Sequence, residues 1–565
     1  MSRGRTALAV GPLLFLAVLF VWPLGRVLAL GLVGAEGGPL TPVAAVLTDP
    51  ALRAAAWFTL WQAALSTLLT LAVGIPVAAV LSRLEFRGRR GVEAAVLVPF
   101  VLPTVVVGAA FVALLGALPG DVPRRGLVPI ILAHAFFNVS GVVRTVGGLW
   151  QHLDPAPALA ARGLGATPLR AFAVATLPRL RPAIAAAAVV VFLFTFTSFG
   201  VVLVLGGSGA ATIEVEIHRA ATRFLDLRTA AALSVVQLAA VAATLAVYGR
   251  LRRRGGTERL RRAAAARRPL RSTADRAAVA GALGLLAVLQ GAPLAALVLR
   301  SLRVGDGWSL AHYRRLDAPT REAVLAVAPL EALANSVAIA TAAAAFALVL
   351  GLSAAVAAAG GAQLARLADG ALMLPLGTSA VTLGLGLLLT FRSGPLAGRG
   401  SVLLVPLAQA LIATPFVVRT VLPVLRGIDD RLREAVATLG ATPRRVRREV
   451  DLPIVSRAGL VAAGFAFAIA VGEFGATVFV ARASNPTVPV AIERALGLPG
   501  AVNLGRALAL SVLLAALTGL VVLLVARVRV GAGGRVWRAP RRGAGGGVRD
   551  RSRRAGGRRP RRRGR

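Results

Sequence analysis

The sequence predicts an all-α polytopic membrane protein with about 12 transmembrane helices, arranged as two parallel six-helix repeats. Three observations support this fold class. Hydrophobic residues make up 57% of the 565 residues and the mean hydropathy is +0.75, which is more apolar surface than a soluble domain can bury. Long apolar runs recur along the chain. A short polar stretch between such runs occurs twice, in the same register.

The repeated stretch reads LAARGLGATP at residues 159–168 and EAVATLGATP at residues 434–443. Each copy reaches a Leu-Pro pair at the same spacing after its glycine. Upstream, the run VVRTV occurs at residues 142–146 and again at residues 417–421, so one constant offset relates the two regions. The chain therefore contains an internal repeat that extends beyond the loop itself.

Composition excludes several classes of protein. The chain has no Cys, which removes disulfides, thiol catalysis and thiolate metal sites. Its four His residues are scattered without metal-ligand spacing, so no metal site is expected. All 65 basic residues are Arg, and a Walker phosphate loop requires Lys. If ATP drives this protein, another chain binds it, and no cofactor is expected in this one.

Six spans are expected in the first half. Residues 1–5 are short and basic, and the apolar run after them can cross a bilayer; a cleaved signal peptide is the alternative for this segment. The Arg-rich turn at residues 83–90 should be cytoplasmic. The first repeat loop, residues 152–182, is too polar and too rich in Pro for hydrocarbon, and residues 206–229 are expected to be external. The six spans are residues 7–33, 57–81, 94–118, 128–150, 183–205 and 230–248.

The second half repeats this plan after an Arg/Ala/Gly-rich segment that is typical of a solvated cytoplasmic linker. Landmarks stay nearly in register, with Gly74 matching Gly351 and Gly108 matching Gly384. The six spans are residues 277–299, 334–358, 370–391, 402–425, 458–481 and 504–526.

The expected domains follow from these spans. Residues 1–50 and 277–332 each form a transmembrane helix with an external loop. The two six-helix repeats have their main bodies at 51–250 and 333–528, joined by the linker 251–276. Residues 529–565 are expected to be a disordered Arg/Gly-rich tail; attraction to anionic lipid headgroups is the alternative for the tail.

The topology follows from the span count. Six crossings separate the two repeat loops, so both face the same side, and their Arg content places that side in the cytoplasm. Both chain termini are expected there as well. The halves are therefore parallel repeats, and the inverted repeats of many secondary transporters are disfavoured.

The repeated loop is predicted to contain two short helices with a bend. In the second copy, the residues from Glu434 favour a helix, Gly440 permits a tight bend, and Thr442-Pro443 can begin another helix. Such a unit, held by spans on both sides, can pass a push from a soluble partner to the membrane helices. The alternative is that both are ordinary cytoplasmic loops that record an old duplication.

The pattern Glu-Ala-Ala, three residues, Gly and a later Leu-Pro resembles the loop of permease subunits in binding-protein-dependent ABC importers. The resemblance implies the type-1 ABC permease (MetI-like) fold in each half, with loops that couple to a cytoplasmic ABC ATPase dimer carrying ATP and Mg, and an external solute-binding protein that delivers the cargo. Two copies in one chain resemble the fused ferric-iron and thiamine permease branch. The matching positions are Leu159, Ala160, Ala161, Gly165 and Pro178 in the first copy, and Glu434, Ala435, Gly440 and Pro453 in the second.

Within that branch, ILAHAFFN at residues 131–138, LGG at residues 205–207 and ATIEVEI at residues 211–217 resemble the thiamine permease most closely. The resemblance implies import of thiamine or ferric iron across a bacterial plasma membrane. One departure is Leu159, where the family pattern has Glu. Since Leu cannot make the charge-assisted contact available to Glu434, the two couplings to the ATPase are expected to be unequal.

Five side chains are candidates for contact with the cargo or its binding protein. Glu473 falls inside the predicted eleventh span, where a carboxyl is costly, and Ser198 is its repeat mate; both are candidate pathway or gate residues. A carboxyl paired with Arg or backbone inside the bundle is the alternative. Glu214, Glu216 and His218 are expected on the external side, facing a cationic ligand or the basic face of a binding protein, or simply solvated. No catalytic constellation is found, so the chain is not expected to be an enzyme.

Two other functional classes stay open from the residues alone. An ion-gradient-driven secondary transporter would work without an ATPase. A membrane scaffold whose Arg-rich tail binds nucleic acid would account for the net charge of +41, but the tail lacks interleaved aromatic residues for base stacking, and no specific nucleic-acid partner is expected.

Overall fold

Helices make up most of the chain in the computed structural model, which confirms the all-α prediction. The predicted linker and tail lie largely outside the described residues. The structure describes residues 2–33, 38, 40–120, 123–207, 209–254, 267–317, 327–359, 370–392 and 401–533.

The first half begins with a helix that contains a π-helical turn and ends with a long helix leading toward the linker. Its elements are α1 (Ser2–Leu16), the π turn η1 (Ala17–Val21), α2 (Trp22–Leu32), α3 (Thr41–Thr48), α4 (Pro50–Arg83), β1 (Leu84–Glu85), α5 (Arg89–Leu97), the 3-10 turn η2 (Pro99–Val101), α6 (Thr104–Ala117), α7 (Leu127–Trp150), α8 (Ala156–Gly163), α9 (Pro168–Ala171), the π turn η3 (Phe172–Thr176), α10 (Leu177–Phe196), α11 (Gly200–Leu205), α12 (Ile213–Thr222) and α13 (Leu227–Arg254).

The second half repeats this order with a small hairpin inserted near its start. Its elements are β2 (Arg268–Pro269), α14 (Thr273–Leu286), the π turn η4 (Ala287–Gly291), α15 (Ala292–Ser301), β3 (Arg303–Val304), β4 (Gly307–Trp308), α16 (Ala311–Arg314), α17 (Pro329–Ala359), the 3-10 turn η5 (Leu374–Gly377), α19 (Ala380–Thr390), α20 (Ser401–Arg426), α21 (Asp430–Thr438), α22 (Pro443–Val446), the π turn η7 (Arg447–Asp451), α23 (Leu452–Gly472), α24 (Thr477–Val480), α25 (Val488–Gly497) and α26 (Ala501–Gly533).

The helices long and apolar enough to span a membrane number ten among the described residues. They agree with ten of the twelve predicted spans. The predicted span 94–118 is instead a bent pair, Arg89–Val101 with Thr104–Ala117, and the second helix is bent by 105° from the first. Pro103, just before α6, has no N–H to donate into a continuous helix. In the ninth predicted span, 370–391, the apolar helix is the shorter Ala380–Thr390.

Two further boundaries differ from the prediction. The fifth and eleventh spans, predicted to end at residues 205 and 481, end at Phe196 and Gly472. Each is followed by a few non-helical residues and then by a short helix, α11 or α24. The start of the fifth span also differs. The first repeat loop was expected to extend to residue 182 because it is rich in Pro, but the helix from Pro168 to Phe196 is continuous.

Every π turn in the described chain ends two residues before a proline. The prolines are Pro23, Pro178, Pro293 and Pro453. A proline inside a helix removes a hydrogen bond and its ring clashes with the carbonyl four residues earlier. One extra residue in the preceding turn, which is the definition of a π bulge, relieves that clash. The Leu-Pro pairs of the repeated stretch therefore mark widened helical turns.

Close packing between helices is repeated in the two halves. A Cβ built on Gly74 of α4 would lie 2.7 Å from Val142 of α7, and one on Gly351 of α17 would lie 2.6 Å from the Cβ of the matching Val417 of α20. Because lipid offers no hydrophobic drive for helix association, such small residues allow the contacts that hold the helices together.

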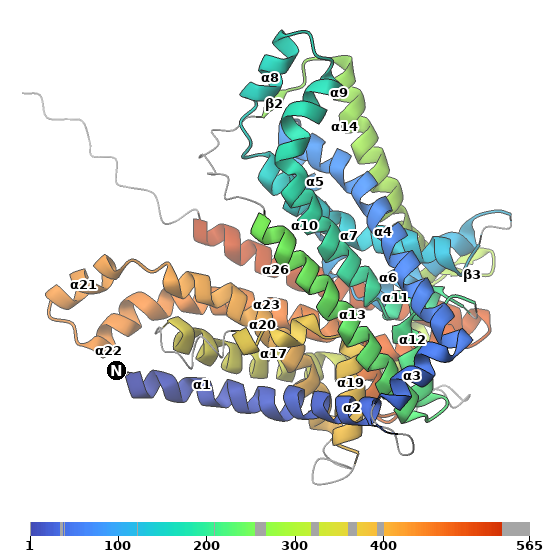
Figure 1. The fold of residues 1–565 in the computed structure, drawn as a ribbon. Coiled ribbons are helices and arrows are strands. Elements are labelled where there is room, and N and C mark those ends of the chain that lie inside the picture. The colour runs from blue at the N-terminus through green and yellow to red at the C-terminus, as the bar shows by residue number, and fades with distance from the viewer. Residues whose placement is uncertain are drawn as a thin grey trace, which may run out of the picture.

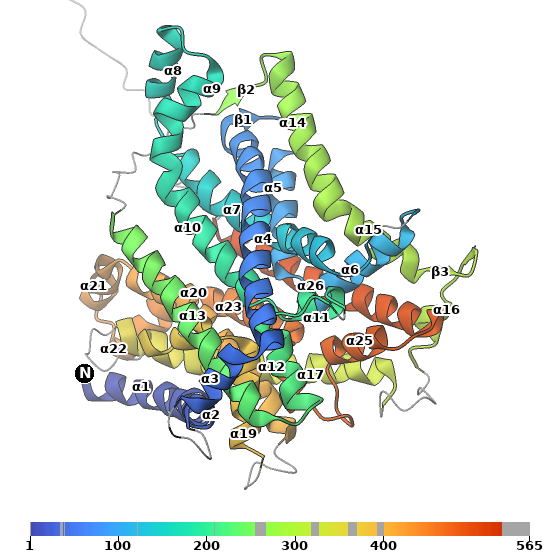
Figure 2. The same cartoon turned by 45° about the vertical axis from the view of Figure 1, so that its right-hand side comes forward.

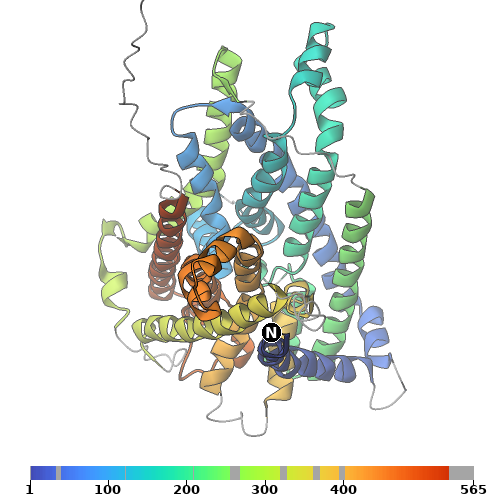
Figure 3. The ribbon, with the colours of Figure 1, turned by 90° about the vertical axis from the view of Figure 1, so that its left-hand side faces the viewer.

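The N-terminal helices of each half also pack against helices of the other half. The segment α1–α2 of the first half packs against α17 and α19 of the second (Figure 3), and α15 of the second half packs against α6 of the first. Trp22 meets Phe391 edge to face at a centroid distance of 5.9 Å. The largest buried core extends through both halves, so they form one packed unit.

The repeated loops lie at separate ends of the molecule. Figure 1 shows α8 and α9 at the top and α21 and α22 at the left, and Figure 2 shows the same separation after a 45° turn. In Figure 1, the long helices of the two halves run from these ends toward the right-hand side of the molecule, where α11 and α12 lie.

Replacing the packed glycines by alanine should destabilise the protein. Gly74→Ala and Gly351→Ala force a methyl group against a valine, an overpacking that costs about 1–3 kcal/mol. Thermal unfolding of the purified chain in detergent measures the effect as a lower midpoint. Gly281→Ala is the matched control, because nothing lies within 4 Å of its built Cβ. Alanine should stabilise that position by about 0.5–1 kcal/mol, and equal effects at all three positions would contradict the packing argument.

Candidate functional site

The two repeated loops have the same local structure, which was predicted from the sequence. In each, a short helix ends at a glycine in the left-handed region, with φ of +86° at Gly165 and +82° at Gly440. In each, a threonine then caps the next helix: Thr167 accepts from Arg170 N–H at 3.3 Å, and Thr442 accepts from Arg445 N–H at 3.4 Å. The predicted helix–bend–helix unit is confirmed in both copies.

Each loop presents an exposed leucine at its bend. Leu164 is 90% exposed and its repeat mate Leu439 is 87% exposed. Leu159 is 60% exposed, and Glu434 at the matching position is also exposed. No ion pair of the Glu434 carboxylate occurs within the described chain. Both loops are thus apolar at the tip, and only the second adds a free carboxylate.

Different forces hold the two loops against their membrane helices. In the first copy, Phe172 of η3 stacks on Trp150 at the end of α7, with ring centroids 5.6 Å apart. In the second copy, Arg433 of α21 donates to Asp451 at 2.9 Å and to Asp430 at 2.6 Å. The first loop is therefore fixed by an apolar stack and the second by a partly exposed ion pair between Arg433 and Asp451, which salt can screen.

An aromatic pair joins the two halves. Phe199 and Phe474 occupy matching repeat positions, and their rings stack at a centroid distance of 5.2 Å with an interplanar angle of 14°. Both are buried. Each lies in the break that ends a spanning helix, α10 or α23. The His218 ring lies edge-on between Phe199 and Phe479, at 5.3 and 5.5 Å.

The two predicted pathway residues, Ser198 and Glu473, directly precede this pair. The Ser198 hydroxyl bonds to His134 Nε2 at 2.8 Å, and His134 Nδ1 bonds to the Ser66 hydroxyl at 3.0 Å. Glu473 accepts from Ala476 N–H at 2.8 Å and from Thr477 N–H at 3.0 Å. Its position inside the eleventh span is corrected: the helix ends at Gly472, and the carboxylate is buried because it caps the start of α24.

The predicted location of Glu214 in a wet external loop is wrong. This residue lies in α12 and is completely buried. Its carboxylate accepts hydrogen bonds from Gln237 of α13 and, at 2.8 Å, from Ser379 at the start of α19 in the other half. Burial raises the pKa of the Glu214 carboxyl to about 8, although both hydrogen bonds act in the opposite direction.

The neighbouring candidates differ in exposure. His218 is buried, and burial, with the charges of Arg223 and Arg219, lowers its pKa to about 4, so the ring is neutral near pH 7. Glu216 is partly exposed and pairs with Arg219 at 2.8 Å. The prediction of a solvated loop is therefore wrong for this helix, because α12 packs into the bundle against α13 and α4.

The structure brings some predicted residues together and leaves others apart. Ser198, Glu473 and His218 surround the aromatic pair, whereas the loop residues lie at the ends of the two halves. Sequence analysis missed Phe199 and Phe474 themselves. The signal was present, because both follow the paired positions Ser198 and Glu473 and precede paired glycines. In the described part of the chain, no group of three His, Asp or Glu residues could hold a metal ion.

Comparisons with known proteins identify relatives over most of the chain. No protein-family model matches it. A "probable ABC transporter permease protein" of Sinorhizobium fredii is 26% identical over 477 residues, covering 78% of this chain and 81% of that protein. The thiamine transport system permease protein of Brucella abortus is 28% identical over 492 residues, covering 84% of this chain and 87% of that protein. The homologues of this chain are ABC transporter permeases.

Other relatives of this chain match shorter parts. The putrescine transport system permease protein of Escherichia coli is 33% identical over 175 residues, covering 30% of this chain and 61% of that protein. A solved chain from a bacterial ABC transporter involved in alginate import has a TM-score of 0.38 and 18% identity, covering 44% of this chain and 95% of that chain. The chain itself is all-α and built from two repeats, and its named relatives differ in cargo.

The raised pKa of Glu214 predicts a pH-dependent stability. Its ordinary pKa is 4.5 and its folded pKa is about 8, so the protonated carboxyl favours the folded state. This stability is complete below about pH 4.5 and is lost as the pH rises through 8, by at most about 1.4 kcal/mol per pH unit. Unfolding midpoints at pH 5 and pH 8.5 should differ less in Glu214→Gln than in the wild type. Glu216→Gln is the control, and a Glu214→Gln variant with wild-type pH dependence would rule out this carboxyl as the source.

Proposed function

We propose that this permease is the transmembrane subunit of an ABC importer that carries a small solute, with thiamine as the first candidate and ferric iron as the second. An external solute-binding protein delivers the cargo, and a separate cytoplasmic ATPase, which holds ATP and Mg, drives transport. The observation that carries the proposal is the pair of loops with identical bends, caps and π turns, in a chain whose ABC permease homologues match most of its length. Both termini and both loops then face the cytoplasm of a bacterial cell.

The loops have the surface that docking to an ATPase requires. Leu164 and Leu439 project from the bends with almost no cover, and burying a leucine side chain stabilises a complex by about 1.5–3 kcal/mol. Behind each bend, a short helix leads through a π turn directly into a spanning helix, α10 or α23. A displacement of the loop is therefore passed on to a membrane helix as rigid-body motion.

The stacked pair of Phe199 and Phe474 is suited to be the gate. It lies where the ends of α10 and α23 meet across the two halves, so motion of the two loops apart or together acts on the contact between these rings. Breaking an aromatic stack costs about 0.5–1.5 kcal/mol beyond the area it buries. That cost is small against the energy of ATP-driven docking, and Ser198 and Glu473 become accessible when the rings part.

Thiamine is favoured as the cargo by two observations. The Brucella abortus relative that matches both halves is a thiamine transport system permease protein. The candidate gate consists of aromatic rings beside a carboxylate, and thiamine carries a positively charged aromatic thiazolium ring. Aromatic faces attract such cations with about 0.5–2 kcal/mol, and Glu473 supplies the opposite charge.

Disrupting one bend should uncouple ATP hydrolysis from uptake. Gly440→Pro cannot adopt the φ of +82° found there, since proline fixes φ near −65°. In vesicles that hold the permease, the ATPase and the binding protein, we expect ATP-dependent uptake to be lost while the chain remains inserted and the ATPase remains active. Wild-type uptake by an inserted Gly440→Pro chain would contradict the proposal.

The two loops should contribute unequally. Glu434→Ala removes a carboxylate available for a charge-assisted hydrogen bond, worth about 1.5–3 kcal/mol, so ATPase binding should weaken about tenfold or more. Leu159→Ala, at the matching position, should weaken it less. Glu331→Ala is the control, because this exposed carboxylate lies at the start of α17. A pull-down titration with the ATPase measures all three, and equal effects of Glu434→Ala and Leu159→Ala would refute the inequality.

The same vesicles identify the cargo. We expect ATP-dependent uptake of thiamine, with ferric iron and putrescine tested in parallel, each with its own binding protein. Uptake of ferric iron in place of thiamine would identify ferric iron as the cargo. Uptake that needs an ion gradient and no ATPase would favour a secondary transporter and contradict the importer assignment.

A further inference from the structure

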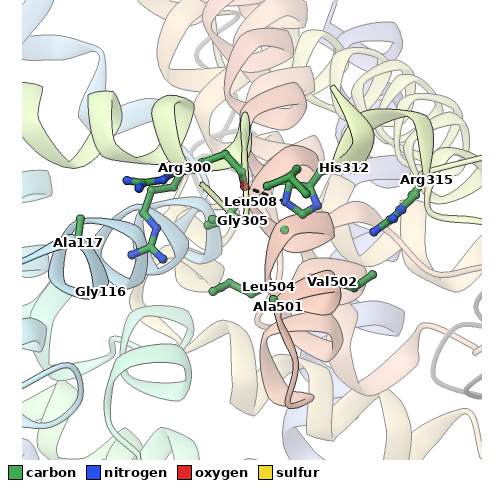
Figure 4. A pocket seen from close by; sticks show the side chains of 13 residues that line it. Gly116, Ala117, Arg300, Gly305, His312, Arg315, Ala501, Val502, Leu504 and Leu508 are labelled. Atoms are coloured by element: carbon green, nitrogen blue, oxygen red, sulfur yellow. Dashed lines mark hydrogen bonds between the residues drawn. The ribbon is translucent and has the colours of Figure 1, made fainter. Parts of the chain in front are cut away.

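A basic pocket of about 500 Å³ lies at the ends of three helices, away from the repeated loops (Figure 4). Its walls come from the end of α6, the end of α15 with the segment that follows it, and the start of α26. Four basic side chains line it: Arg300, Arg303, His312 and Arg315. No acidic side chain is among the described residues that line it.

One wall of the pocket holds a polar atom without a partner. His312 is 5% exposed, and its Nε2 lies 3.2 Å from the carbonyl oxygen of Arg303. Since the carbonyl can only accept, Nε2 is the donor. Nδ1 is buried and has no hydrogen-bond partner within the described chain. The ring packs directly on Gly505 of α26, where a Cβ would overlap it. A buried polar atom left unpaired lowers stability, so this wall of the pocket is polar as well as basic.

The positive charges of the arginines that line the pocket are only weakly neutralised by other groups of the protein. Arg300 donates to the carbonyl oxygen of Ala113 at a long 3.5 Å. Arg303 faces Asp306 at 3.9 Å, and both side chains are exposed, at 59% and 108%. Exposed pairs of this kind contribute little. Arg315 is exposed and has no ion pair within the described chain. The guanidinium charges are therefore available to an anion.

The start of α26 adds to the positive potential. This helix is 33 residues long, and its first turn, beginning at Ala501, lines the pocket. The free N–H groups and the dipole at a helix N-terminus favour an anion. Helix α26 therefore acts on the same volume as the arginines and His312.

The position of the pocket in the membrane is unusual for so many arginines. It lies where α15 ends, and α14, at the start of the same span, lies at the end of the molecule that carries α8 and α9 (Figure 2). If those loops are cytoplasmic, which rests on the proposed function, the pocket is on the external surface. Arginines near span ends normally concentrate on the cytoplasmic side, so this cluster is not explained by orientation.

We propose that this pocket binds a phosphate group, carried by an anionic phospholipid headgroup of the outer leaflet or present as free phosphate. Guanidinium groups bind phosphate oxygens through paired N–H donors, and three of them surround the pocket. The pocket lies level with the ends of three membrane helices, where lipid headgroups are found.

Binding to the full-length chain tests the proposal without any ATPase. Inorganic phosphate is titrated calorimetrically into the detergent-purified permease, and retention of phosphatidylglycerol against phosphatidylcholine is measured by native mass spectrometry from nanodiscs of each lipid. Arg300→Gln and Arg315→Gln should each weaken binding about tenfold, the effect of losing one charge-assisted hydrogen bond. Arg315 is exposed, so its replacement leaves the fold intact.

Arg314→Gln is the matched control, because Arg314 is an exposed neighbour that does not line the pocket. Binding of inorganic phosphate identifies a site for the free anion, and selective retention of phosphatidylglycerol alone identifies a lipid site. Absence of both, or an equal loss in Arg314→Gln, overturns the proposal. Because no transport is measured, either result is independent of whether the importer assignment holds.

Discussion

Backbone hydrogen bonding at the helix breaks is the constraint on which the rest of this structure depends. Hydrocarbon cannot satisfy free N–H and C=O groups, so each break needs donors and acceptors from elsewhere in the protein. The start of α12 donates from Ile213 N–H to the Thr59 hydroxyl, and the start of α25 donates from Val488 N–H to the matching Ser336 hydroxyl. In the break after α23, the Glu473 carboxylate accepts from the N–H groups of Ala476 and Thr477. These caps let the chain end the spanning helices α10 and α23 inside the bundle, where the two aromatic rings then meet.

Proline also disturbs backbone hydrogen bonding within the helices, because it has no N–H to donate. The Leu-Pro pairs at Pro178 and Pro453 are accommodated by π turns, and these turns connect the loops to α10 and α23. The widened turn fixes how the short helices of each loop are oriented on the spanning helix. The Leu-Pro pair of each repeated stretch therefore marks the turn that connects the loop to its spanning helix.

The duplication has not kept the halves equivalent. The loops share their bends, but one is held by a stack on Trp150 and the other by ion pairs of Arg433. Glu214 bonds to Ser379 across the halves, whereas the matching positions are Pro489 and Pro103, which cannot form such a bond. A polar contact between the halves can therefore be present at one position and absent at the matching position of the repeat, even where the backbone is similar.

The sequence by itself determined the features that depend on neighbouring residues: the all-α membrane class, most of the spans, the two repeats, and the helix–glycine–helix bends with their threonine caps. Those features follow from hydropathy, left-handed glycines and local capping, which act within a few residues. Only the tertiary structure determined that Glu214 is buried against Ser379, that Glu473 caps a break instead of lying within a span, and that Arg300, His312 and Arg315 share one pocket. Each of these depends on which helices pack together, and the pattern along a single apolar run does not specify its neighbours.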